Sequence, residues 1–230
     1  RIRALTRCSK TTERGSVIDT MRYVSASPSL RLHKRNKSDL EWKQLLFPWM
    51  DSPEEVVGTL NGRTALQIAL NHLNIRGGRA LLPAFTCTSV APIFRKASMQ
   101  VSFYDVDESG TPVLDQIYKQ LGSENHAVVM ILHYCGFPNQ VLEEVSDIAA
   151  STGTVLLEDC AHSALSFDGP RPLGSTGSAG IFSLRKSFPV PDGGSLVINS
   201  TNKPIPDPDS GPGLASTTLG MMYLMAGSVE

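Results

Sequence analysis

A chain of 230 residues, 41% hydrophobic and 19% charged, has the composition of a soluble globular protein and is long enough to bury one substantial core. The formal net charge of −1 gives no sign of nucleic-acid binding, and no apolar run approaches the roughly 20 residues that a membrane span requires. None of the four cysteines belongs to a Cys-x-x-Cys pair, so the sequence predicts no zinc site, no other metal site and no disulfide framework. A reducing, cytoplasmic setting is the default expectation.

Positive charge is concentrated at the start of the sequence. Residues 1–39 contain ten Lys or Arg and three acidic residues, which leaves 11 basic and 19 acidic residues in the remainder. We predict a solvated, poorly ordered tail, because this composition cannot supply a core. A transit peptide is the alternative, since such peptides are also basic, rich in Ser and poor in acids. The sequence begins with Arg1 rather than Met, as a fragment of a longer chain would.

From about residue 56 the chain alternates between strand-like and helix-like patterns. Apolar residues recur at helical spacing, or form short apolar runs bounded by turn residues. The predicted helices are residues 64–74, 113–121 and 141–150. The predicted strands are residues 80–82, 101–106, 127–132, 154–157, 180–184 and 195–199. Strands that alternate with helices predict an α/β fold, a three-layer α/β/α arrangement around a mostly parallel sheet.

The composition changes after residue 200. Residues 201–213 contain four prolines and two glycines and are predicted to form a loop or linker, and residues 215–226 could begin a helix. We therefore divide the chain into a basic tail at 1–39, a large domain at 40–200, and a linker with the start of a truncated region at 201–230.

The ends of the strands are where ligand chemistry is expected. Sheets of this kind bind ligands at the carboxyl ends of their strands, so the junctions between strand and loop carry the candidate residues. Four junctions contain polar or flexible residues, namely 61–64, 83–89, 158–162 and 183–194.

Two charged residues follow predicted strands. Asp159 comes after an apolar run, where a carboxylate can face a ligand such as the protonated pyridine nitrogen of pyridoxal phosphate (PLP). A helix cap or an ordinary loop aspartate is the alternative. Lys186 follows another strand and precedes a loop with two prolines and two glycines, a common setting for a functional lysine. A lysine after a strand is otherwise usually a surface residue.

A phosphate site is predicted where the first helix begins. Gly62 lets the backbone approach an anion, and the helix start supplies N–H groups and positive dipole. Arg63 or Thr64 could add side-chain contacts to the phosphate. Ser183 is a second candidate donor, with an ordinary buried serine in a strand as the equally weighted alternative.

Six motifs occur together in one order. They are Asn-Gly-Arg-Thr-Ala-Leu (61–66), Leu-Pro-Ala-Phe-Thr (82–86), Asp-Val-Asp (105–107), His-Tyr-Cys-Gly-Phe-Pro (133–138), Glu-Asp-Cys-Ala-His (158–162) and Phe-Ser-Leu-Arg-Lys (182–186) with Pro-Asp-Gly-Gly (191–194). In this register the chain resembles the DegT/DnrJ/StrS family of PLP-dependent sugar aminotransferases, which has the aspartate-aminotransferase fold (PLP fold type I). The resemblance covers about residues 56–200.

The resemblance implies roles for individual residues. Lys186 matches the lysine that forms the Schiff base with PLP, and Asp159 matches the partner of its pyridine nitrogen. The family's glutamine near the phenolic oxygen of PLP matches His162. Its phosphate ligands match Ser183 and the turn formed by Gly62, Arg63 and Thr64.

Three departures from the family pattern follow. The aromatic residue that usually stacks on the pyridine ring falls at Cys87, so that either a thiol packs there or Phe85 or another residue takes the role. His162 places a titratable imidazole where the family has an amide. The family's carboxy-terminal small domain has no counterpart in this sequence.

The implied reaction is transfer of an amino group, usually from glutamate, to a keto sugar attached to a nucleotide. The resemblance also implies a homodimer with active sites at the interface, and neither a nucleic-acid partner nor a membrane span is expected. Three alternatives stay open: a family member that binds PLP without full turnover, a sugar dehydratase that uses the pyridoxamine form, and an α/β domain that binds another phosphate ligand at Gly62. Members of the dehydratase class lack the lysine, so Lys186 argues against the second.

Overall fold

The computed structural model describes residues 47 and 56–199. The predictions of a basic tail at 1–39 and of a linker and helix within 201–230 lie outside the described residues. The proposed domain division therefore stays a prediction.

Helices and strands alternate along the described chain, as the sequence predicts. The strands are β1 (Val56–Thr59), β2 (Arg79–Pro83), β3 (Gln100–Tyr104), β4 (His126–Leu132), β5 (Val155–Cys160), β6 (Phe167–Asp168), β7 (Arg171–Pro172), β8 (Ala179–Phe182) and β9 (Gly194–Ile198). The helices are α2 (Gly62–His72), α3 (Ala91–Lys96), α4 (Leu114–Ser123) and α5 (Leu142–Thr152), with short 3-10 turns at Tyr134–Gly136 and Leu184–Lys186.

Seven of these strands form one sheet in the order β1-β9-β8-β5-β4-β2-β3. The five strands from β8 to β3 run parallel to one another, whereas β9 runs antiparallel to both of its neighbours, β8 and β1. The prediction of a mostly parallel sheet is confirmed. The strands β6 and β7 pair with each other in a separate hairpin.

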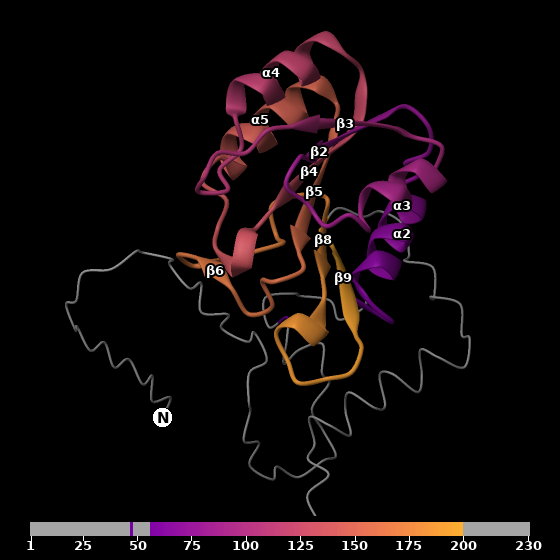
Figure 1. The fold of residues 1–230 in the computed structure, drawn as a ribbon, viewed down its shortest axis with the longest axis vertical. Coiled ribbons are helices and arrows are strands. Elements are labelled where there is room, and N and C mark those ends of the chain that lie inside the picture. The colour runs from indigo at the N-terminus through magenta and orange to yellow at the C-terminus, as the bar shows by residue number, and fades with distance from the viewer. Residues whose placement is uncertain (1–46, 48–55, 200–230) are drawn as a thin grey trace, which may run out of the picture.

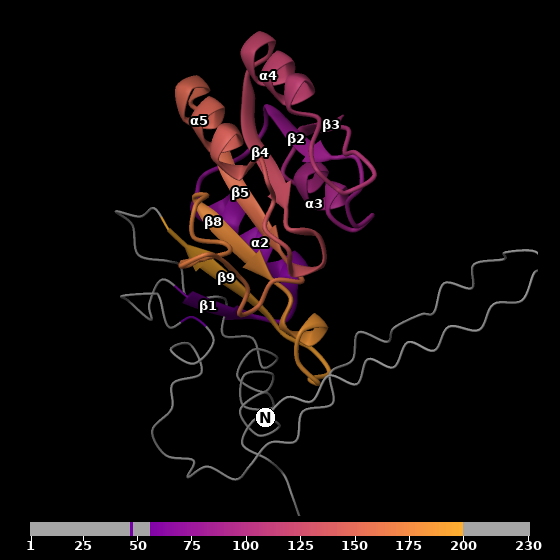
Figure 2. The ribbon, with the colours of Figure 1, turned by 90° about the vertical axis from the view of Figure 1, so that its left-hand side faces the viewer.

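Helices cover both faces of the sheet. Figures 1 and 2 show α2 and α3 on one side and α4 and α5 on the other. Side chains of β4 alternate accordingly: Val128 and Met130 pack in the cluster with α2, and Val129 and Ile131 pack in the cluster with α5. The three-layer α/β/α architecture is confirmed, and the alternation leaves each strand end with one side chain facing α2 and the next facing away.

Local sequence explains where the helices begin and end. Asn61 caps α2, since its side chain accepts hydrogen bonds from two backbone N–H groups of the first turn. Gly153 ends α5 in the left-handed conformation, with φ of 69°. The helix α3 has only six residues, with Pro92 in its first turn, and is too short for a periodic pattern to reveal.

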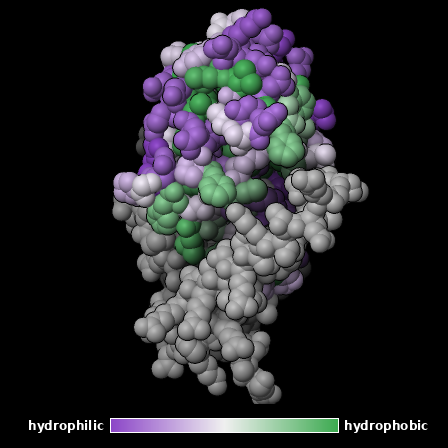
Figure 3. All heavy atoms as spheres, turned by 60° about the vertical axis from the view of Figure 1, so that its left-hand side comes forward, coloured by the Kyte–Doolittle hydropathy of each residue, from purple (hydrophilic) through white to green (hydrophobic). Residues whose placement is uncertain are grey.

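On the face shown in Figure 3, apolar side chains lie between hydrophilic ones. The most exposed large ones are Phe137 (73%) and Phe85 (69%), both in loops at the carboxyl ends of strands. No helix in the described part of the chain is long and apolar enough to cross a membrane.

Candidate active site

A cavity of about 210 Å³ lies at the carboxyl ends of the parallel strands, between the start of α2 and the ends of β5 and β8. Six of the predicted site residues border it, together with Arg185: Gly62, Arg63, Cys87, Asp159, Ser183 and Lys186. The sheet topology brings them together, because the loops after β2, β5 and β8 open at the same edge. Thr64 borders a neighbouring cavity, and His162 contacts Lys186 from outside the lining.

Asp159 presents a buried carboxylate to this cavity. Its side of β5 faces α2, and the residue is only 7% exposed. Burial raises the pKa of Asp159, while the N–H of Ala161 and then the charge of Lys186 oppose the shift. The Ala161 N–H donates to Oδ1 at 3.0 Å, and no other described residue donates to the carboxylate. One carboxylate oxygen is therefore available for a cationic or N–H-bearing ligand.

Lys186 lies at the end of the 3-10 turn that follows β8. Its backbone N–H donates to the Ser183 carbonyl, and its Nζ lies 2.9 Å from Nε2 of His162. A lysine ammonium can only donate, so His162 Nε2 accepts and the ring proton is on Nδ1. Burial, followed by the positive charge of Lys186, lowers the pKa of His162, which favours this neutral form.

Ser183 and Gly62 lie side by side in the lining of the cavity. The Ser183 residue is buried, and its hydroxyl makes no hydrogen bond with any described residue. A Cβ placed on Gly62 would lie 3.6 Å from the Ser183 Cβ, so a larger residue would fill this space. The pair forms a small polar cradle that suits a phosphate oxygen.

The first turn of α2 is capped by the side chain of Asn61. Oδ1 of Asn61 accepts from the N–H groups of Arg63 and Thr64, each at 3.1 Å. These donors are therefore satisfied within the chain, and the anion contacts left for the turn are the Gly62 backbone and the Arg63 side chain. Asparagine directly before a helix is among the strongest capping signals, so the sequence did contain this information.

A glycine pair holds the start of α2 against the sheet. The N–H of Gly193 donates to the Leu60 carbonyl at 2.9 Å. A Cβ on Gly194 would lie only 2.3 Å from the carbonyl carbon of Asn61. Glycine at the start of β9 therefore allows the turn before α2 to pack directly on the strand, which fixes the start of α2 beside the cavity.

The loop after β2 places a thiol, not an aromatic ring, at the cavity. Cys87 Sγ lies 3.1 Å from Ser89 Oγ, and hydrogen bonds from the side chain and then the backbone of Ser89 lower the pKa of the Cys87 thiol. Phe85 stacks instead on Tyr134, with ring centroids 5.5 Å apart and an interplanar angle of 16°. Of the two sequence alternatives, the structure places Cys87 at the cavity and engages Phe85 elsewhere.

Tyr134 ties two of the site loops together. Its hydroxyl donates to the carbonyl oxygen of Phe85. Burial, followed by the negative charge of Asp159, raises the pKa of Tyr134 to about 12, so the phenol keeps the proton that it donates. The contact joins the loop after β4 to the loop that carries Cys87.

A buried polar cluster lies on the opposite face of β5 from Asp159. Glu158 accepts from His133 Nε2 at 2.9 Å and from the backbone N–H groups of residues 174, 176 and 177. His133 Nδ1 accepts from the N–H of Asn139, so the ring proton is on Nε2. Although ligand atoms of His133, Glu158 and Cys160 lie within 4.8 Å of one another, these bonds occupy the carboxylate and the imidazole. We assign the cluster a structural role that sequence reasoning missed.

Several solved structures have a similar fold. Solved structures that share the fold include DesI in the presence of its TDP-sugar product, with a TM-score of 0.55 and 28% identity over 63% of this chain and 37% of that chain. GDP-4-keto-6-deoxymannose-3-dehydratase (ColD) with bound GDP-perosamine has a TM-score of 0.56 at 20% identity, over 63% of this chain and 40% of that one. At that identity the second likeness shows the fold alone.

Sequence comparison gives the family. Residues 49–203 match the DegT/DnrJ/EryC1/StrS aminotransferase family, and the chain belongs to it. A curated relative, L-glutamine:scyllo-inosose aminotransferase of Streptomyces griseus, is 30% identical over 142 residues, which are 59% of this chain and 32% of the relative. The chain thus spans about a third of the length of that relative.

Proposed function

We propose that this chain forms the cofactor-binding part of a PLP-dependent aminotransferase that transfers an amino group from glutamate to a keto sugar. The observation that carries the proposal is that Lys186 and the buried carboxylate of Asp159 border one cavity, and that Ser183 and Gly62 belong to the same lining. A carboxylate, an amine and a hydroxyl in this arrangement match the pyridine nitrogen, the aldehyde and the phosphate of PLP. When bound, PLP supplies an electron sink for the carbon that loses a proton.

Each residue then has a defined task. Asp159 keeps a proton on the pyridine nitrogen, because a buried carboxylate with one free oxygen gains most from a cationic partner. The amine of Lys186 moves the proton at the reacting carbon as general base and acid. His162 accepts from Lys186 Nζ and so orients that amine. Ser183, Gly62 and the Arg63 side chain hold the phosphate.

The acceptor is proposed from the relatives. One curated relative is named for scyllo-inosose, and one related structure contains a TDP-sugar product. Both names describe a ring with several hydroxyl groups, and we propose such a keto compound, nucleotide-linked as in DesI, as the acceptor. We further propose a cytoplasmic homodimer, in which a second copy completes the site.

A member that binds PLP without turnover is the second candidate. The observation that favours it is Cys87, which borders the cavity at the position where the family usually has the aromatic residue that stacks on the cofactor. The dehydratase alternative is disfavoured by Lys186, which borders the cavity beside Asp159.

The test is attachment of PLP to Lys186. Purified full chain with PLP should develop a visible absorbance band that borohydride abolishes, and peptide mass spectrometry should then find the added mass on Lys186. Lys186→Ala should show neither signal, whereas Lys119→Ala, on the exposed face of α4, should keep both. Attachment to other lysines at the same yield in Lys186→Ala would overturn the assignment.

Turnover is measured separately. Glutamate alone should convert the bound cofactor and release its keto acid in a single turnover. If PLP attaches to Lys186 but no keto acid forms, the second candidate is correct and the first is wrong.

A further inference from the structure

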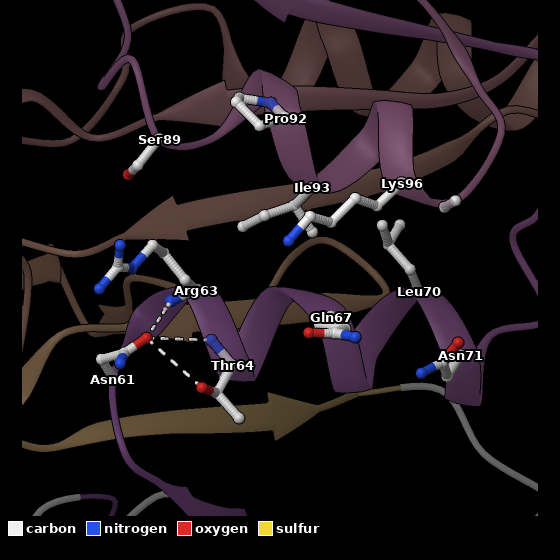
Figure 4. A pocket seen from close by; sticks show the side chains of 11 residues that line it. Asn61, Arg63, Thr64, Gln67, Leu70, Asn71, Ser89, Pro92, Ile93 and Lys96 are labelled. Atoms are coloured by element: carbon white, nitrogen blue, oxygen red, sulfur yellow. Dashed lines mark hydrogen bonds between the residues drawn. The ribbon is translucent and has the colours of Figure 1, made fainter.

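A second cavity, of about 470 Å³, lies between α2 and α3 beside the candidate active site. Figure 4 shows it as a groove with one wall from each helix. It shares four lining residues with the first cavity, namely Asn61, Arg63, Ser89 and Ile93. The reaction proposed above assigns no task to this groove.

Among the residues that the structure describes, two cations and no acidic side chain line the groove. Arg63 of α2 and Lys96 of α3 line it, and neither forms an ion pair with a described residue. No acidic side chain of the described residues belongs to the lining. In Figure 4 the Lys96 chain extends across the gap above Gln67, and the Arg63 guanidinium points toward Ser89 at the other end.

Neutral polar groups and an apolar wall complete the groove. The neutral polar residues are Asn61, Thr64, Gln67, Asn71 and Ser89, and the apolar ones are Leu70, Pro92, Ile93 and Ala97. Gln67 makes no hydrogen bond with a described residue, so its amide is free for a ligand. Two cations with several neutral donors suit an anion with many acceptor oxygens, and the apolar wall suits an organic group attached to it.

We propose that the groove between α2 and α3 binds a phosphate-bearing ligand that is distinct from the phosphate of the cofactor. A diphosphate fits best, because the cations lie at separate places along the groove and a diphosphate presents acceptors to both. This proposal goes beyond the proposed function, since it concerns a second ligand and requires no reaction at Lys186. The two sites share Arg63, so occupancy of one should alter the affinity of the other.

The test is calorimetric titration of the full chain without PLP, with inorganic pyrophosphate as the probe. Lys96→Gln should weaken binding at least tenfold, whereas Lys119→Gln, the same exchange on the exposed face of α4, should leave the affinity unchanged. Lys96→Arg should retain most of the affinity, because the charge stays at the end of α3. Circular dichroism of each variant shows whether it is folded.

Further arms identify the source of the phosphate. If uridine or thymidine diphosphate binds more tightly than pyrophosphate, the ligand is nucleotide-linked. Equal affinities indicate an inorganic anion. No binding of any probe, or equal weakening in Lys96→Gln and Lys119→Gln, would overturn the proposal. Because Lys96 lines the groove but not the first cavity, Lys96→Gln should still attach PLP at Lys186, so failure of PLP attachment and failure of this groove give different results.

Discussion

The carboxyl group of Asp159 is buried and accepts few hydrogen bonds. It receives one hydrogen bond from within the described chain, and burial raises its pKa. When the pKa of a group is higher in the folded than in the unfolded state, the free energy of unfolding falls as the pH rises above the unfolded-state pKa. The same feature that prepares the residue for a cationic ligand thus destabilises the protein without one.

Asp159→Asn should therefore stabilise the protein without PLP. We expect an increase of a few degrees in the melting temperature at pH 7, because the amide keeps the bond from Ala161 and removes the buried charge. The gain should shrink as pH falls through the raised folded-state pKa and vanish below the ordinary pKa of aspartate, about 3.9, where the carboxyl group is protonated in both states. Glu144→Gln, an exposed acid on α5, is the control and should change little. A lower melting temperature for Asp159→Asn at pH 7 would mean that the carboxylate is already compensated.

His162 should make stability depend on pH near neutrality. Its pKa is lowered by burial and by Lys186, so the unfolded chain binds a proton that the folded chain resists. Stability contributed by the neutral ring is present above about pH 6.5, the ordinary pKa of histidine, and is lost as pH falls below it. Between pH 7.5 and 5.5, the melting temperature of His162→Gln should decrease less than that of the unmodified chain. Parallel curves for the two proteins would contradict this assignment.

Sequence reasoning found the charged residues of the site more readily than the groups that support them. Asp159 and Lys186 stand at strand ends, where direction along a parallel sheet decides which side chains meet. Their partners depend on contacts between distant loops. The Tyr134 hydroxyl donates to the Phe85 carbonyl, and Glu158 accepts hydrogen bonds from the loop before β8. The sequence of that loop has no periodic pattern that would predict these contacts.

At the scale of elements, the start of α2 depends on two glycines in β9 and its approach. Gly194→Ala would place a methyl group 2.3 Å from the Asn61 carbonyl carbon, so either α2 or β9 must move. We expect a loss of about 1–3 kcal/mol in unfolding free energy, as for overpacking in other cores. Urea titration followed by circular dichroism measures it.

Gly122→Ala is the matched control for that change. Nothing lies within 4 Å of a Cβ at Gly122, which is within α4. Alanine is the better helix former, so this variant should be more stable by roughly 0.5–1 kcal/mol. If Gly194→Ala shows the same sign as Gly122→Ala, the close approach does not constrain the fold.

The alternating pattern predicted most elements and the mostly parallel sheet, but not the antiparallel direction of β9. The long helices and the central strands were confirmed, because a buried face leaves a repeating apolar pattern. The six residues of α3 are too few for such a pattern, and nothing in the sequence of β9 shows that it runs against its neighbours. Boundaries also shifted, since β8 ends at Phe182 and Leu184 begins a 3-10 turn.

At the scale of the whole molecule, Glu158 joins parts of the chain that are far apart in sequence. It links β5 to His133 after β4 and to the loop before β8. Burial raises the pKa of Glu158, but the bonds from His133 and the backbone outweigh it and hold that pKa below its ordinary value. Its contribution is present above about pH 4.5 and is lost as pH falls.

Glu158→Gln should destabilise the whole domain. An amide offers one oxygen where the carboxylate accepts four hydrogen bonds, and each buried donor left unsatisfied typically costs about 1–3 kcal/mol. Glu143→Gln removes an exposed partner of Arg171 and should cost less than about 1 kcal/mol. Thermal unfolding at pH 7 compares them, and similar losses in both variants would contradict the role given to Glu158.

The pairing of β1 with β9 has a consequence for synthesis of the protein. Val56 lies opposite Val197, so the first strand of the sheet waits for a partner 141 residues (197 minus 56) further along the chain. At ribosomal rates of about 5–20 residues per second, that interval lasts roughly 7–28 seconds. During it the nascent chain carries an unpaired β1, and only near its end does β8 add an open edge, because β8 is synthesised shortly before β9. Chaperones that bind extended apolar segments can therefore bind β1 before β9 leaves the ribosome.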